Sequence, residues 1–282
     1  MNIFSKKQDT PKSQAELIFQ AQTSRERLFR ANVGLSWFIL LFILVFIFSG
    51  QDITIGTKTF SGIQIDTNFM ANNLSFIAGG LGQTIKISFL SIILAMILAL
   101  LAALGRLSTL PPVYALSTFY VSLIRGTPLI LQIFFFYLAL PQLGIILSPL
   151  LSGVLALGLN YGAYMSEIFR AGLSSVGKGQ REAAMALGMT PTQTMQRIVL
   201  PQALRFAIPP VGNEFIAMTK DSALVSVTGF AHELMWRSIK VGRAQFHTLE
   251  ALIMAAMFYW GMTLILTYVQ SIIETRLSKG DR

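Results

Sequence analysis

The sequence predicts an all-α integral membrane protein with six transmembrane helices. Of its 282 residues, 53% are hydrophobic and only 12% are charged, whereas soluble domains carry roughly 25% charged residues. Several windows of about 20 residues contain almost no charge, and this is the length that crosses the hydrocarbon core of a bilayer. A soluble domain of this length has too little interior to bury so much apolar surface.

Six apolar segments account for the expected spans. The first is the most apolar, because no polar side chain lies between Trp37 and Phe48, and the fifth is the most polar. We expect the spans near residues 33–49, 84–105, 113–140, 150–170, 203–228 and 249–273. We therefore expect a cytoplasmic tail over 1–32, an extra transmembrane helix over 33–49 and an external segment over 50–80. A transmembrane domain follows over 81–275, with a polar insert at 172–201. Residues 276–282 form a second cytoplasmic tail.

The basic residues indicate the orientation of these spans. The net charge is +9, and most of the 22 Lys and Arg residues lie in the two tails, the turn at 106 and the segment 170–205. Lys and Arg collect on the cytoplasmic side of membrane proteins, so we expect both termini and the polar insert to be cytoplasmic, and no nucleic-acid partner is needed to explain the charge. A smaller group on the opposite side, Arg237, Lys240 and Arg243, is either a tolerated exception or a contact with an external partner.

Several kinds of chemistry have no support in the sequence. There are no cysteines and only two histidines, which excludes disulfides, zinc–thiolate sites and iron–sulfur clusters. His232 and His247 share no ligand spacing, so we expect no metal or other cofactor on this chain. No G-x-x-x-x-G-K-[ST] sequence is present, and the chain therefore does not hydrolyse ATP by itself. A membrane-embedded enzyme is correspondingly poorly supported.

The polar insert has the signals of two short helices. Residues 182–187 are strong helix formers, and Gly188 follows where a left-handed residue ends a helix. Thr190 is then placed as an N-cap with Pro191 at the first helical position, and Gln193 completes a capping box. We expect a second short helix over 191–200, stopped by Pro201. The insert is thus a bent helical pair at the membrane surface.

The spacing of these residues resembles the EAA loop of permease subunits of ATP-binding cassette (ABC) importers. The matching positions are Glu182-Ala183-Ala184, Gly188, Ile198 and Leu200-Pro201. Three further stretches are similar to the polar amino acid subfamily: LIRGTPL at 123–129, YMSEIFRAG at 164–172 and KDSAL at 220–224. The resemblance covers roughly residues 75–275, and it implies a five-helix type I importer core to which the first span is an addition.

The resemblance implies a function for the insert and a set of partners. In that family the loop docks on a separate ATPase; the alternative for the residues themselves is an amphipathic helix lying on lipid. The implied partners are ABC ATPase subunits that bind ATP-Mg, an external solute-binding protein, a second permease subunit (self or paralogue) and the lipid of a bacterial inner membrane. The implied ATPase-coupling residues are Glu182, Ala183, Ala184, Leu187, Gly188, Ile198, Leu200 and Pro201.

Polar side chains inside the spans are the candidates for a substrate pathway. Ionisable groups in hydrocarbon mark either a pathway or a buried ion-pair network, and both interpretations stay open. Arg125 precedes Gly126-Thr127-Pro128, where the helix should kink or open, and transporters often place substrate at such breaks. Asn160, Tyr164 and Glu167 share one helix face. The candidate pathway residues are Arg125, Thr127, Asn160, Tyr164, Glu167, Glu214, Lys220, Asp221 and Ser222.

The sequence as a whole predicts the permease subunit of an ABC importer for polar amino acids. The alternative is a self-contained secondary transporter or channel, which explains the intramembrane charges but leaves the EAA pattern without a reason. Inward acids such as Glu167 and Glu214 suit a cationic amino acid, although the family uses similar residues for several substrates. Which amino acid is carried is not encoded in any motif.

Overall fold

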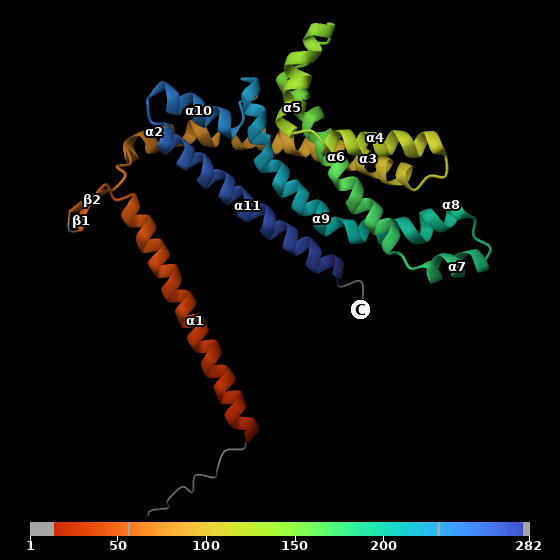
Figure 1. Ribbon diagram of the computed structural model, residues 1–282, viewed down its shortest axis with the longest axis horizontal. Helices are drawn as coiled ribbons and strands as arrows, with labels where there is room; N and C mark the ends of the chain where they lie inside the picture. The colour runs from red at the N-terminus through yellow and green to blue at the C-terminus, as the bar shows by residue number, and fades with distance from the viewer. Residues whose placement is uncertain (1–13, 56, 230–231, 279–282) are drawn as a thin grey trace, which may run out of the picture. The chain divides into compact units, whose positions relative to one another are not determined.

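A computed structural model describes residues 14–55, 57–229 and 232–278 of the chain (Figure 1). The predicted tails therefore lie partly outside the described residues, at 1–13 and 279–282. The chain divides into two compact units, Met1–Asp66 and Thr67–Arg282. Helix α2 (Thr67–Ala78) belongs to the second unit because it packs with the helices of that unit. The boundary of the membrane domain at 80/81 stays a prediction.

The first unit consists of one long helix and a hairpin. Helix α1 (Gln14–Ile47) starts inside the expected tail and continues through the first predicted span without a break. Its apolar part, Thr23–Ile47, is long and apolar enough to cross a membrane. Strands β1 (Asp52–Ile55) and β2 (Lys58–Ser61) pair antiparallel with Asp52 opposite Ser61. This hairpin was not expected, although the β-branched residues of 53–55 favour a strand.

All described secondary-structure elements of the second unit are helices or helical turns. Its membrane helices are α3 (Leu81–Arg106), α4 (Pro111–Arg125), α5 (Leu129–Phe134), α6 (Pro149–Ser175), α9 (Leu200–Asp221) and α11 (Thr248–Ser278). Its short elements are α7 (Lys178–Ala186), α8 (Pro191–Thr194), α10 (Leu234–Ala244), the π turns η1 (Phe135–Ala139) and η3 (Met195–Val199), and the 3-10 segments η2 (Leu140–Leu143) and η4 (Ser222–Thr228).

The predicted helical membrane architecture is confirmed, while the count of six spans stays a prediction. Every expected span coincides with a helix or a bent pair of helices. Among the described residues, three helices are long and apolar enough to cross a membrane, at Thr23–Ile47, Thr67–Arg106 and Thr248–Arg276. A fourth span is added if the bent pair α4 and α5 is counted as one. Helices α6 and α9 are long but carry more polar side chains.

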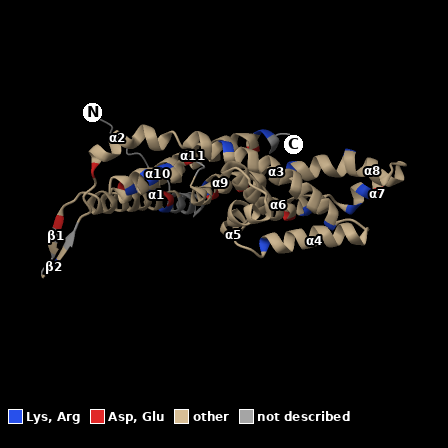
Figure 2. Ribbon diagram, turned by 90° about the horizontal axis from the view of Figure 1, so that it is seen from above, with Lys and Arg blue, Asp and Glu red and all other residues tan. Residues whose placement is uncertain are grey.

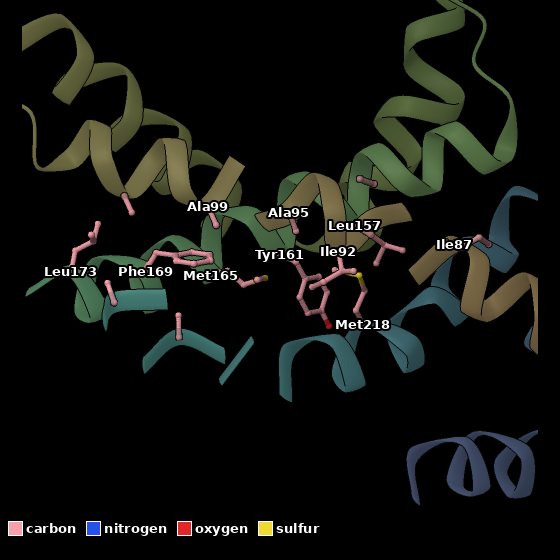
Figure 3. Packing of buried hydrophobic residues seen from close by; sticks show 14 of the residues in the cluster. Ile87, Ile92, Ala95, Ala99, Leu157, Tyr161, Met165, Phe169, Leu173 and Met218 are labelled. Carbon is pink, nitrogen blue, oxygen red and sulfur yellow. The ribbon is translucent and has the colours of Figure 1, made fainter. Parts of the chain in front are cut away.

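The core of the second unit is the contact between α3 and α6 (Figure 3). Ala95 and Ala99 of α3 are fully buried and face Tyr161, Met165 and their neighbours on α6. The helices approach closely because α6 has glycines in the contact. A Cβ on Gly158 would lie 2.6 Å from Leu94 Cδ2. Small residues at such positions are typical of helix packing in membranes, where backbones approach one another.

The Gly158→Val variant tests this packing. The added atoms meet the side chain of Leu94 in a filled core, and overpacking of this kind costs about 1–3 kcal/mol of unfolding free energy. Gly82→Val on α3 is the matched control, since a Cβ there meets nothing within 4 Å. Thermal unfolding in detergent should show a lower midpoint for Gly158→Val only. Equal midpoints for the two variants would contradict the packing described.

The third predicted span is broken where the sequence predicts it. Helix α4 ends at Arg125, α5 starts after Pro128, and the two are bent by 104°. Pro128 has extended backbone angles, φ −63° and ψ 140°, which a helix cannot continue through. The Gln132 side chain donates to the freed carbonyl of Ile124 at 2.9 Å. The same amide donates to the Thr127 carbonyl at 3.2 Å, so two carbonyls at the break are satisfied within the protein, as non-helical backbone at membrane depth requires.

The polar insert has the predicted start but a different end. Helix α7 is followed by Gly188 at φ +81°, and Thr190 forms a complete capping box with Gln193. The expectation that Pro201 stops the second helix was wrong: α8, η3 and α9 follow one another without a gap. Pro201 lies in the first turn of α9, where the missing N–H is tolerated, and the π turn η3 lies directly before it. The second helix of the insert is thus an extension of α9.

The connection between α9 and α11 is fixed by a buried acid. Glu233 caps α10 by accepting hydrogen bonds from the backbone N–H groups of Met235 at 2.9 Å and Trp236 at 2.6 Å. The hydroxyl of Tyr259 on α11 donates to the same carboxylate at 2.7 Å. The side chain is fully buried, and this burial raises the pKa of Glu233 although the hydrogen bonds oppose the shift. Helix α10 is therefore held rigidly against α11.

Candidate functional site: a polar cavity beside the helix break

A polar cavity of about 310 Å³ lies where the broken helix meets α6 and α9. Three residues at the break, 127–129, line the cavity. The chain turns away after α4 and leaves this space open. Helices α6 and α9 contribute mostly polar side chains. The lining residues are Thr127, Pro128, Leu129, Asn160, Tyr161, Tyr164, Glu214 and Asp221.

The polar groups of the cavity are held by hydrogen bonds. The Tyr161 hydroxyl donates to Asp221 Oδ2 at 2.8 Å, which joins α6 to the end of α9. Asn160 Nδ2 donates to Gln132 Oε1 at 3.3 Å. Two carboxylates, Glu214 and Asp221, line the cavity and no basic side chain does. The cavity therefore suits a ligand that carries a positive group.

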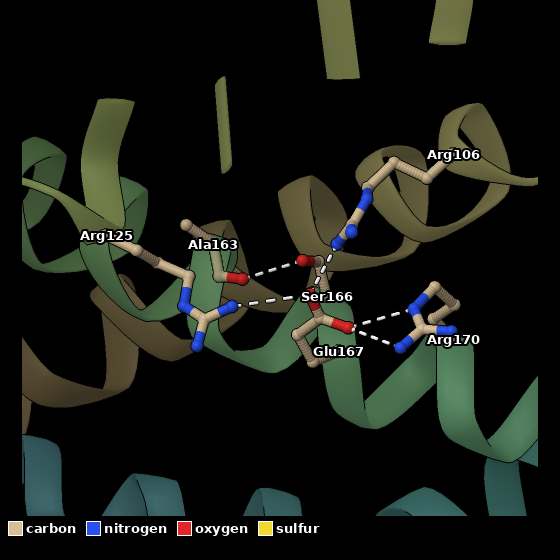
Figure 4. Close-up of polar contacts among 6 residues, drawn as sticks. All are labelled: Arg106, Arg125, Ala163, Ser166, Glu167 and Arg170. Carbon is tan, nitrogen blue, oxygen red and sulfur yellow. Dashed lines mark hydrogen bonds and ion pairs between the residues drawn. The ribbon is translucent and has the colours of Figure 1, made fainter. Parts of the chain in front are cut away.

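An ion-pair cluster lies next to the cavity (Figure 4). The carboxylate of Glu167 on α6 accepts from Arg106 of α3, from Arg125 of α4 at 3.3 Å and from Arg170 one turn along at 2.9 Å. Arg125 also lies 5.2 Å from the centroid of the Tyr164 ring, which lines the cavity. One acid thus joins three helices, and the cluster has an excess of two positive charges.

The structure separates the nine predicted pathway residues into three groups. Arg125 and Glu167 pair with each other beside the cavity. Lys220 is exposed and does not line it, and Ser222 is buried with its hydroxyl donating to the Thr219 carbonyl at 2.9 Å. The remaining five line the cavity together: Thr127, Asn160, Tyr164, Glu214 and Asp221. The sequence left a substrate pathway and an ion-pair network open as alternatives for these residues. The structure contains both a lined cavity and an ion-pair network.

Sequence reasoning missed residues that shape the site. Tyr161 is not among the predicted pathway residues, because Asn160, Tyr164 and Glu167 define a helix face that does not include it. Gln132 was missed altogether. Its signal was available, since a glutamine amid apolar residues just after a proline break is placed to satisfy freed carbonyls. Arg106 and Arg170 contributed only to the prediction of membrane orientation and were not predicted to belong to the site.

Glu167→Gln tests whether the cluster stabilises the second unit. The amide keeps the shape but removes the charge, so three guanidinium groups lose their common partner, and the expected cost is about 1–3 kcal/mol of unfolding free energy. Glu182→Gln, at an exposed acid of α7, should stay within roughly 0.5 kcal/mol of the wild type. Thermal unfolding in detergent measures both. A Glu167→Gln midpoint equal to that of Glu182→Gln means that the ion pairs add no stability.

The insert presents an exposed apolar surface at the end of α7. Leu187 is 83% exposed and Met185 is 54% exposed, while Ala184 faces inward and is buried. Arg181 ties α7 to α6 by donating to the Leu173 carbonyl. Of the other predicted coupling residues, Glu182, Ala183, Gly188 and Pro201 are exposed, and Ile198 and Leu200 are partly buried. The surface is charged at one side and apolar at its tip.

Comparison with known proteins places this architecture in a family. The model of the family described as binding-protein-dependent transport system inner membrane component matches residues 91–279. The chain is 40% identical to the arginine transport system permease protein ArtQ of Bacillus subtilis (strain 168), over 78% of this chain and 100% of that protein. It is 43% identical to the L-cystine transport system permease protein TcyB of the same organism, over 72% and 87%.

A solved structure agrees with these relatives. It is described as the crystal structure of an amino acid ABC transporter with histidines; the TM-score is 0.71 at 37% identity, covering 76% of this chain and 99% of that one. The chain belongs to the family of binding-protein-dependent transport system inner membrane components. It is the membrane permease subunit of an ABC importer, not the ATPase. The self-contained transporter or channel is thereby disfavoured.

Proposed function

We propose that the insert 172–201 docks this permease on its ATPase partner. The exposed Met185 and Leu187 at the end of α7, beside the left-handed Gly188, support the proposal, because adjacent exposed apolar side chains often mark a protein-interaction surface. The ATPase binds and hydrolyses ATP-Mg. Because α8 and η3 lead straight into α9, a displacement of the insert reaches the helix that carries Glu214 and Asp221.

We propose further that the polar cavity is the passage for a polar amino acid. The observation that carries this is the pair of carboxylates, Glu214 and Asp221, in a cavity without a basic lining residue. The ammonium group of an amino acid is the natural partner for these acids. The excess positive charge of the Glu167 cluster lies beyond Tyr164 and offers a partner for the carboxylate of the same ligand.

The assembly that follows is a complete importer in a bacterial inner membrane. Both termini and the insert are cytoplasmic, consistent with the distribution of Lys and Arg. A second permease subunit, either a second copy or a paralogue, completes the membrane part. The external binding protein named in the family description delivers the ligand.

Competition binding tests the passage. The complex of permease and ATPase is purified in detergent, and a labelled cationic amino acid is competed with other polar amino acids and with their N-acetyl derivatives. The proposal predicts competition by the free amino acids and at least about tenfold weaker competition by the acetylated ones, because a hydrogen bond to a charged group is worth roughly 1.5–3 kcal/mol. Equal competition by acetylated and free ligands contradicts an acidic ammonium site.

A further inference from the structure

The turn between α10 and α11 presents a phenylalanine in an unusual way. Phe246 is 93% exposed, and its φ of 61° lies in the left-handed region, which bulky residues seldom adopt. The turn is closed by hydrogen bonds from the backbone N–H of Gln245 to Val241 at 3.1 Å and of His247 to Gly242 at 2.9 Å. An exposed ring and a strained backbone at one residue both disfavour this turn in the isolated chain.

The turn is nevertheless rigidly supported. A Cβ on Gly242 would lie 2.8 Å from the Ala251 Cβ and 3.0 Å from the Thr248 Cα, so α10 and α11 touch at this point. The His247 ring stacks on Phe69 of α2 with centroids 4.7 Å apart. The turn that carries Phe246 is therefore held in place by contacts with α2 and α11. Strain that the surrounding structure maintains in this way is characteristic of functional positions.

Exposed basic side chains of α10 lie on the N-terminal side of the turn that carries Phe246. Lys240 and Arg243 of α10 are exposed, and Lys240 lies 4.8 Å from the Trp236 ring centroid. The acids next to α10, Glu233 and Glu250, are buried. Helix α2, which packs beside α10, contains no charged residue. Lys and Arg are marked on α10 in Figure 2. The surface formed by Lys240, Arg243 and Phe246, here called the basic tip, is thus apolar at its centre and cationic beside it.

The position of the basic tip indicates what covers it. Within the second unit, α10 and α2 lie at the opposite end from α7 and α8 (Figure 1). With the insert on the cytoplasmic side, as proposed above, the basic tip is external. Clustered Lys and Arg are disfavoured there by the topology rule. Topology therefore does not explain this cluster, whereas a partner protein with an acidic surface does.

We propose that the basic tip is a docking site for the external solute-binding protein of this importer, which would receive Phe246 in an apolar socket rimmed by carboxylates. The inference rests on the proposed orientation of the permease. An aromatic anchor in a pocket, with charges around it, is the usual form of an energetic hot spot. The charges would guide the encounter and align the two proteins.

Binding to the reconstituted importer tests the basic tip. The complete complex is placed in nanodiscs of neutral lipid, and the dissociation constant of its solute-binding protein is measured for three variants. Phe246→Gly relieves the left-handed strain, so its thermal midpoint should be no lower than that of the wild type, while binding weakens at least about tenfold. The double variant Lys240→Glu with Arg243→Glu should also weaken binding at least about tenfold and remove its salt dependence. Lys240→Arg with Arg243→Lys is the matched control and should bind within about twofold of the wild type, because both rim charges are kept.

The outcomes separate this inference from the proposed function. ATP hydrolysis by the complex without binding protein should be the same in all variants, since none of them touches the insert or the cavity. Wild-type binding in both Phe246→Gly and the charge reversal, with hydrolysis intact, overturns the docking site and leaves the permease function standing. An effect of the same variants only in nanodiscs of anionic lipid, with unchanged affinity for the binding protein, assigns the tip to lipid and equally overturns the proposal.

Discussion

Gly188→Val is expected to lower ATP-driven uptake about tenfold while the membrane domain stays folded. Gly188 ends α7 at φ +81°, and a Cβ there meets no other atom within 4 Å. The substitution is therefore opposed only by the backbone conformation. A left-handed residue with a side chain costs about 1–2 kcal/mol, and 1.4 kcal/mol corresponds to a tenfold change in an equilibrium constant. The bend would relax, and the apolar tip would leave its position against the ATPase.

Gly177→Val is the matched control for this experiment. Gly177 lies in the same insert, also with open space around it, but at φ −54° and ψ 143°, where valine is accommodated. Co-purification of the ATPase and uptake by proteoliposomes should be near wild type for Gly177→Val and reduced for Gly188→Val. If both variants retain ATPase binding and uptake, the bend of the insert is not the coupling element.

Asp221→Asn and Glu214→Gln are expected to have the second large effect. Both acids line the cavity, and a hydrogen bond to a charged group is worth about 1.5–3 kcal/mol. The concentration for half-maximal uptake of a cationic amino acid should rise at least about tenfold in each variant, given tenfold per 1.4 kcal/mol. Tyr161→Phe removes only the hydroxyl that donates to Asp221, and a neutral donor is worth about 0.5–1.5 kcal/mol, so its effect should be smaller.

Lys220→Gln provides the control for the cavity variants. Lys220 is adjacent to Asp221 in sequence, but it does not line the cavity. Uptake should therefore stay within about twofold of the wild type, as expected for a surface change. Unchanged uptake in Asp221→Asn and Glu214→Gln, measured beside this control, would remove the cavity from the transport path.

Local signals in the sequence predicted local structure well. The capping box of Thr190 and Gln193, the left-handed Gly188 and the break at Pro128 all depend on backbone preferences of neighbouring residues, and each is present. The structural role of Pro201, by contrast, depends on the conformation of the residues before it. Whether a proline ends a helix or occupies its first turn is decided by the residues before it, here the π turn η3, and this turn has no clear sequence signal.

The sequence indicated which residues belong to the site, but not which side chains they pair with. The acids and amides of α6 and α9 were recognisable because polar groups inside spans require a reason. Their pairing required the three-dimensional arrangement: Arg106 reaches Glu167 across 61 residues of sequence, and Tyr161 reaches Asp221 across 60. Helical periodicity places residues on a face, but the bend of 104° between α4 and α5 determines which face borders the cavity.

Substrate uptake by the reconstituted importer tests the central claim most directly. Proteoliposomes containing the permease and its ATPase, with the binding protein on the opposite side from ATP, are loaded with ATP or with a non-hydrolysable analogue. We expect accumulation of a polar amino acid only with hydrolysable ATP, about tenfold less of it when the permease carries Gly188→Val, and none when the ATPase is left out. Accumulation by the permease alone, driven by an ion gradient, would contradict it.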